Sequence, residues 1–214
     1  MNNPNLILET FPVGPLSCNC SIIGDPVSRK AILVDPGGDE GKIIDRLFDL
    51  DLQVDLIIHT HAHLDHFLAS GKMKETTGAN LALHQEDLFL WNNLENQCQM
   101  FGIPYKKTPP PDQFLEHDEE IGIGKVKGKA IHTPGHTPGS MCFLFESKKF
   151  LIAGDTLFQG SIGRTDLWGG NFQKIEQSIK EKLYTLDEEI VVITGHGEST
   201  SIGREIRTNS FVRP

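Results

Sequence analysis

The chain has 214 residues, of which 38% are hydrophobic and 23% are charged, and its formal net charge at pH 7 is -9. This composition is ordinary for a globular protein, and the length suits a single domain over residues 1–214. The negative charge disfavours a nucleic-acid binder, which normally presents a basic face. The sequence contains neither an apolar run of the roughly 18 residues that span a membrane nor, over residues 1–14, the pattern of a secretory signal.

The four cysteines are too few for a disulfide framework in a chain of this length. Cys18 and Cys20 would share a face of a strand, but no second Cys/His pair stands at the spacing of a zinc ribbon. We therefore expect buried, reduced thiols in a cytoplasmic protein.

The first part of the chain predicts four strands, over residues 6–13, 18–24, 31–34 and 54–58. Between the last two, apolar residues recur at helical spacing, namely Ile43, Ile44, Leu47, Phe48 and Leu50. A helix, a short strand over 81–84 and a helix that begins near Gln85 follow. From about residue 92 to 114 the pattern weakens and includes several prolines, so we expect a surface excursion over the functional site.

The second part again predicts strands, near residues 121–123, 126–131, 141–145 and 150–153. The last clear helix begins after Asn171, a good N-cap, and its apolar stripe consists of Phe172, Ile175, Ile179 and Leu183. A final strand is expected over 190–194. Two strand-rich halves, each with helices, predict an α/β fold in which two sheets pack face to face with helices outside.

The residues behind the strand at 54–58 form the most informative motif, His61-x-His63-x-Asp65-His66. Imidazole and carboxylate groups suit zinc and neighbouring divalent metals. Side chains two residues apart project to the same side of an extended segment, so His61 and His63 can chelate one metal. The turn that follows can direct Asp65 and His66 to a second metal.

Three further metal-competent side chains each follow a predicted strand. His136 lies in the Pro/Gly-rich loop at 133–140, Asp155 follows Gly154, and His196 stands between two glycines. Together with the first motif this gives seven ligands, a sensible number for two metals if one carboxylate bridges them.

In chain order, these residues resemble the motifs of the metallo-β-lactamase fold superfamily: T-H-x-H-x-D-H at 60–66, G-H-T at 135–137, G-D at 154–155 and G-H at 195–196. The resemblance implies an αββα sandwich of two mixed β-sheets. It implies that His61, His63 and His136 hold the first metal. It likewise implies that Asp65, His66 and His196 hold the second and that Asp155 bridges the two. We expect two divalent ions, zinc in the first place, with iron or manganese as alternatives.

Within the superfamily, residues 154–158 and 161–166 look like those of the glyoxalase II-like branch, which hydrolyses S-acylglutathione thioesters. Few residues follow His196, so the chain is similar to the short proteins of this branch, without a C-terminal helical domain. The resemblance implies hydrolysis of S-lactoylglutathione or a related acylglutathione by a metal-bridging hydroxide. Asp65 is expected to orient that hydroxide, and a thiolate with a pKa of about 8.5 leaves readily.

Substrate contacts are expected from Tyr105, Lys106 and Lys107, a basic cluster that can meet the carboxylates of glutathione; the alternative is a solvated loop tip. Arg164 either touches the substrate or, with Asp166, holds the loop after Asp155 in place. The remaining histidines receive no catalytic role. We expect His59 and His84 to be core residues or residues that orient a ligand.

The main alternative is a persulfide dioxygenase, which uses one iron and oxygen and is similar around residues 163–166. A β-lactamase is disfavoured because Asp155 stands where a cysteine would bridge, and because no export signal is seen. A non-enzymatic interaction module stabilised by metal is disfavoured too, because the open coordination sites of its metals would have to be blocked. The expected partner is a small-molecule thioester, with no nucleic acid and no membrane.

Overall fold

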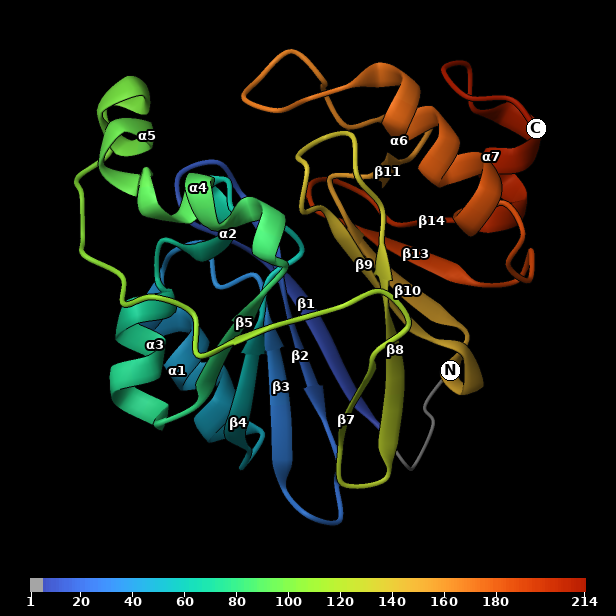
Figure 1. Ribbon diagram of the computed structural model, residues 1–214. Helices are drawn as coiled ribbons and strands as arrows, with labels where there is room; N and C mark the ends of the chain where they lie inside the picture. The colour runs from blue at the N-terminus through green and yellow to red at the C-terminus, as the bar shows by residue number, and fades with distance from the viewer. Residues whose placement is uncertain (1–5) are drawn as a thin grey trace.

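A six-stranded mixed sheet forms the first half of the computed structural model, which describes residues 6–214 (Figure 1). Its strands pair in chain order: β1 (Ile7–Val13), β2 (Cys18–Gly24), β3 (Lys30–Val34), β4 (Gln53–Ile58), β5 (Asn80–Leu83) and β6 (Gln113–Phe114). The neighbours from β1 to β3 pair antiparallel, and those from β3 to β6 pair in parallel. Residues 1–5 are outside the described residues. The predicted domain and the segment tested for a secretory signal both begin there.

A second six-stranded sheet follows, in the order β14-β13-β10-β9-β8-β7. It consists of β7 (Glu120–Ile123), β8 (Val126–His132), β9 (Met141–Phe145), β10 (Phe150–Gly154), β13 (Val191–Thr194) and β14 (Thr200–Ser201). Only β10 and β13 pair in parallel. A small hairpin, β11 (Leu157–Phe158) and β12 (Ser161–Ile162), projects from the end of β10.

Helices cover the outer faces of both sheets. Figure 1 shows α1 (Glu40–Asp49) and α3 (Ser70–Thr77) beside the first sheet, and α6 (Phe172–Ser178) and α7 (Ile202–Thr208) beside the second. Helix α6 continues into a π-helical segment, Ile179–Leu183. Three short helices lie above the strand ends: α2 (Leu64–Phe67), α4 (Leu88–Asn92) and α5 (Leu94–Phe101). None of the helices within residues 6–214 has both the length and the apolar character that crossing a bilayer demands.

Three apolar clusters confirm the expected αββα layering. One lies between the sheets and contains residues from both, such as Ile32 and Phe143. The other two lie between each sheet and its helices. Neighbouring residues of one strand enter different clusters: Ile22 packs outward and Ile23 inward. This follows from the two-residue period of a strand, and it explains why strands buried on both faces read as continuous apolar runs.

Several sequence predictions were wrong in detail. The segment from 92 to 114 is not irregular throughout, because Leu94, Gln97 and Cys98 form the buried side of α5. Phe48 is 83% exposed and Phe172 is 43% exposed, so both lie off the buried stripes of their helices. The strand ending at Thr194 is not the last, and α7 follows β14. The N-cap prediction is confirmed, since the Asn171 side chain accepts a hydrogen bond from the Lys174 amide.

Candidate metal centre

The predicted ligands meet at one end of the two sheets, where loops leave β4, β8, β10 and β13. His61 and His63 come from the loop after β4 of the first sheet. His136, Asp155 and His196 come from loops of the second sheet. The centre therefore lies between the layers and needs both of them.

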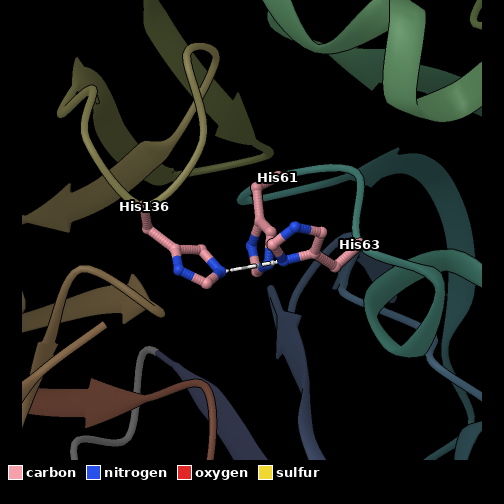
Figure 2. Close-up of side chains that lie close together, drawn as sticks. All are labelled: His61, His63 and His136. Atoms are coloured by element: carbon pink, nitrogen blue, oxygen red, sulfur yellow. Dashed lines mark hydrogen bonds between the residues drawn. The ribbon is translucent and has the colours of Figure 1, made fainter. Parts of the chain in front are cut away.

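His61, His63 and His136 form the first cluster, with their ring nitrogens directed at one another (Figure 2). His63 Nδ1 lies 2.9 Å from His136 Nε2 and 3.1 Å from His61 Nε2, and the two Nε2 atoms are 3.2 Å apart. Tetrahedral zinc with Zn–N bonds of about 2.0–2.1 Å spaces its ligands by about 3.3 Å. The three nitrogens thus fit a shared cation.

Burial keeps these imidazoles neutral, the form that binds a metal. All three side chains are buried. Burial lowers the pKa of His61 and His63 well below its usual range, and the neighbouring imidazoles lower it further. Burial also lowers the pKa of His136, against the opposing effect of the Asp155 carboxylate.

Asp65, His66 and His196 form the second cluster. Asp65 Oδ2 lies 3.1 Å from His196 Nε2 and 3.7 Å from His66 Nε2. Burial would raise the pKa of Asp65, but the adjacent His66 and His196 outweigh it and hold the pKa well below its usual range. The cluster offers one anionic oxygen and two imidazole nitrogens, a donor set that suits divalent transition metals.

Asp155 lies between the clusters. Its Oδ2 is 3.6 Å from His136 Nε2 in the first cluster, and its Oδ1 is 3.5 Å from His66 Nε2 in the second. Within the described residues, Asp155 Oδ1 and His66 Nε2 are both buried and have no hydrogen-bond partner. Such unpaired polar atoms cost about 1–3 kcal/mol each, so their convergence fits a site that a cation completes.

Two hydrogen bonds orient imidazole rings of the clusters. His66 Nδ1 donates to Asp35 Oδ2 at 2.9 Å, and His136 Nδ1 donates to the Arg164 carbonyl oxygen at 2.7 Å. In each ring this leaves Nε2 as the free acceptor facing the centre. Asp35 is itself held by the Thr60 amide and hydroxyl. Asp35 was not among the predicted site residues, although its position just past a buried strand is shared with the other site residues.

The remaining histidines lie apart from the two clusters. His59 is buried, donates from Nδ1 to the Ala82 carbonyl oxygen and lies 2.7 Å from the Ser70 hydroxyl through Nε2. It is a core residue, one of the two roles expected of it. His84 and His132 stack on each other with ring centroids 3.9 Å apart. The four cysteines are buried and free.

The expected substrate contacts are exposed. Lys106 Nζ lies 2.6 Å from Glu40 Oε1, and both residues line a cavity of about 440 Å³. Leu68, directly after α2, lines the same cavity, so it adjoins the helix that carries Asp65 and His66. Tyr105 and Lys107 are exposed on the same segment. Arg164 forms a two-pronged pair with Asp166 at 2.7 and 2.8 Å.

Comparisons with known proteins agree with this geometry. Residues 13–196 match the family model described as the metallo-beta-lactamase superfamily. Hydroxyacylglutathione hydrolase GloC from Haemophilus influenzae is 38% identical over 207 residues, which cover 96% of this chain and 97% of that protein. The crystal structure of the BLEG-1 B3 metallo-beta-lactamase is 33% identical, with a TM-score of 0.90 and coverage of 97% and 100%. The crystal structure of TTHA1623 in a di-iron-bound form is 31% identical, with a TM-score of 0.86 and coverage of 94% and 98%.

Proposed function

This chain belongs to the metallo-beta-lactamase superfamily, and from this premise we propose that it is a binuclear metal-dependent thioester hydrolase. We propose S-lactoylglutathione or a related acylglutathione as the substrate. The superfamily and the GloC relative support a hydrolase. The relative's name supports a glutathione-derived substrate, because the two chains match over nearly their whole lengths.

The position of Asp155 carries the proposal. One of its oxygens faces His136 and the other faces His66, so a single carboxylate reaches both clusters. His61, His63 and His136 would hold one ion, Asp65, His66 and His196 the other, and Asp155 would contact both. When bound, two divalent ions lower the pKa of a coordinated water from about 15.7 to about 7 and polarise a carbonyl oxygen.

The chain's own residues then position the reactants. The Asp65 carboxylate accepts a hydrogen bond from the attacking water and orients it toward the thioester carbon. Asp35 and the Arg164 carbonyl oxygen hold His66 and His136 in the tautomers that keep Nε2 free. The leaving thiolate, with a pKa of about 8.5, departs without a general acid. No serine or cysteine nucleophile is required.

The two ions proposed are zinc, with iron or manganese as alternatives; the di-iron relative supports including iron. Substrate carboxylates are proposed to meet Lys106, Lys107, Tyr105 and Arg164. We also propose a cytoplasmic location, which four buried free cysteines support. Residues 1–214 are proposed to form one domain.

The test is hydrolysis of S-D-lactoylglutathione by freshly purified protein, with metals counted in the same sample. We expect turnover with two metals per chain. Two metals without turnover would contradict the acylglutathione proposal and point to other thioesters or esters. One iron per chain, with oxygen uptake on glutathione persulfide, would instead establish the dioxygenase. A β-lactam serves as a comparison substrate because one relative is described as a B3 metallo-beta-lactamase; we expect slower turnover of it than of the thioester.

A further inference from the structure

Asp87 is a buried carboxylate outside both ligand clusters, at the junction of a 3-10 turn (Gln85–Asp87) and α4. Its Oδ2 accepts hydrogen bonds from the Ala62 amide at 3.0 Å and the Thr137 hydroxyl at 2.8 Å. Its Oδ1 accepts one from the Gly139 amide at 2.6 Å. Ala62 lies between His61 and His63, and Thr137 follows His136. One side chain therefore ties together the two loops that carry the first cluster.

The loops close directly on this carboxylate. A Cβ atom built on Gly139 would lie 2.7 Å from Asp87 Cγ, so any larger residue there would push the second loop away. The two loops also meet through their backbones, since the Met141 amide donates to the Thr60 carbonyl oxygen at 2.7 Å. This hydrogen bond thus joins the loop after β4 in one sheet to the start of β9 in the other.

Gln97 of α5 holds the same segment from a second direction. Its Oε1 accepts from the Leu64 amide at 2.9 Å, and its Nε2 donates to the Ala62 carbonyl oxygen at 3.0 Å. Asp87 and Gln97 together bind both the N–H and the C=O of Ala62. The backbone between His61 and His63 is consequently fixed on both sides, while Asp87 alone reaches across to the His136 loop.

A charge in this position is costly for stability. Burial raises the pKa of Asp87 to about 6, and the hydrogen bonds from Thr137, Ala62 and Gly139 act in the opposite direction. Apolar residues of similar volume often replace a buried charge without loss of stability. The carboxylate nevertheless accepts three hydrogen bonds, and none of the donors belongs to its own helix. All three donors belong to residues next to or near the histidines of the first cluster. This arrangement is typical of a residue that positions ligands.

We propose that Asp87 is a positioning residue for the first cluster: it fixes the separation of His136 from His61 and His63 and thereby sets how tightly that half of the centre holds its metal. The proposal rests on the proposed function only in that the cluster binds a metal. The second cluster has a separate support, because Asp35 holds His66. Loss of Asp87 should therefore weaken one metal and not the other.

The test compares wild type with Asp87→Asn and with Asp25→Asn as a matched control. Asparagine keeps the shape of aspartate but replaces one acceptor oxygen by a donor, so at least one loop amide loses its partner. Asp25 is likewise buried and accepts from Val27, Ser28 and Lys125, where it joins the β2–β3 and β7–β8 turns. Those turns lie at the end of the sheets opposite the centre (Figure 1).

Each protein is loaded with zinc and dialysed against increasing chelator, and zinc per chain is counted by mass spectrometry; the unfolding temperature of the metal-free form is measured separately. We expect Asp87→Asn to lose one of its two zinc ions at a chelator concentration about 10- to 100-fold lower than wild type. The other zinc should be held as in wild type. Asp25→Asn should lower the unfolding temperature but keep both zinc ions.

The proposal is overturned if Asp87→Asn holds both zinc ions as wild type does, or loses both in parallel. If this variant does not fold, Thr137→Val removes one of the three hydrogen bonds and should weaken the same zinc by a smaller factor; retention equal to wild type would overturn the proposal. Wild type that holds two zinc ions without hydrolysing a thioester contradicts the proposed substrate and leaves the role of Asp87 testable. Wild type that holds no metal would overturn both proposals.

Discussion

The Nε2 atoms of His61 and His136 lie 3.2 Å apart, although the two residues are 75 positions apart in sequence and follow strands of different sheets. Folding alone brings them together, because each is fixed at the end of its own strand. An ion bound between them therefore contacts both layers of the sandwich and binds the folded chain in preference to the unfolded one.

Removal of metal should for this reason destabilise the fold. A ligand at a free concentration 1,000 times its dissociation constant stabilises the folded state by about 4.1 kcal/mol. We expect the urea midpoint of unfolding to fall when metal is chelated and to recover when zinc is added back. An unchanged midpoint would contradict a metal shared between the two sheets.

Substitution of the carboxylate between the clusters should affect both metals. Asp155→Ala removes the side chain whose two oxygens face His136 and His66. We expect kcat/KM for S-lactoylglutathione to fall at least about 100-fold, the upper end of the effect of changing a residue that supports a ligand, and metal content to drop. Asp118→Asn, which alters an exposed carboxylate that pairs with Lys129, is the control. Full activity in Asp155→Ala would exclude a bridging role.

The fold and the residues that gather in the two clusters could be predicted from sequence because they depend on local patterns. Strands buried on both faces appear as short apolar runs, and each proposed ligand follows such a run or opens the helix after it. His61, His136 and His196 therefore stand out without knowledge of tertiary contacts. The order of the motifs along the chain resembles that of the superfamily, and this resemblance implied the αββα sandwich.

The supports of the centre could not be predicted in this way. Asp35 contacts Thr60 and His66, and Asp87 contacts Ala62 and Thr137, all at separations of 25 or more residues. A buried aspartate and a solvated one are identical in sequence, and only the tertiary structure shows which amides lie nearby. Helix α5 was missed for a related reason, since one of its three buried positions is Gln97, a polar residue with buried partners.

The basic segment after α5 offers a measurable test of substrate binding. Lys106 is 60% exposed and is paired with Glu40, so its charge is partly neutralised before any substrate arrives. An exposed ion pair contributes about 0.2–1 kcal/mol, and we therefore expect Lys106→Ala combined with Lys107→Ala to raise KM by no more than about 5-fold at unchanged kcat. Lys127→Ala, which breaks the exposed pair with Glu120, is the matched control. An unchanged KM in the double variant would exclude this segment from glutathione recognition.

Tyr184 should govern stability at alkaline pH. Its hydroxyl donates to the carbonyl oxygens of Val212 and Glu205, which ties the C-terminal segment to α6 and its π-helical continuation. Burial, with a smaller effect from the charge of Glu205, raises the pKa of Tyr184 to about 12. In the unfolded chain a tyrosine titrates near 10. Below pH 10 both states keep the proton, and between about pH 10 and 12 the unfolded state loses it first.

The folded state then binds more protons than the unfolded state, so the free energy of unfolding must fall as pH rises through this interval. Tyr184→Phe cannot titrate, but it loses the two hydrogen bonds and should be less stable than wild type by about 1 kcal/mol at pH 8. The difference between the two proteins should shrink between pH 10 and 12, because only wild type pays the cost of keeping a phenol protonated. Urea unfolding at a series of pH values measures this difference directly, and contributions from other titrating groups cancel in it. A gap that stays constant to pH 12 would show that the Tyr184 hydroxyl titrates as it does in the unfolded chain.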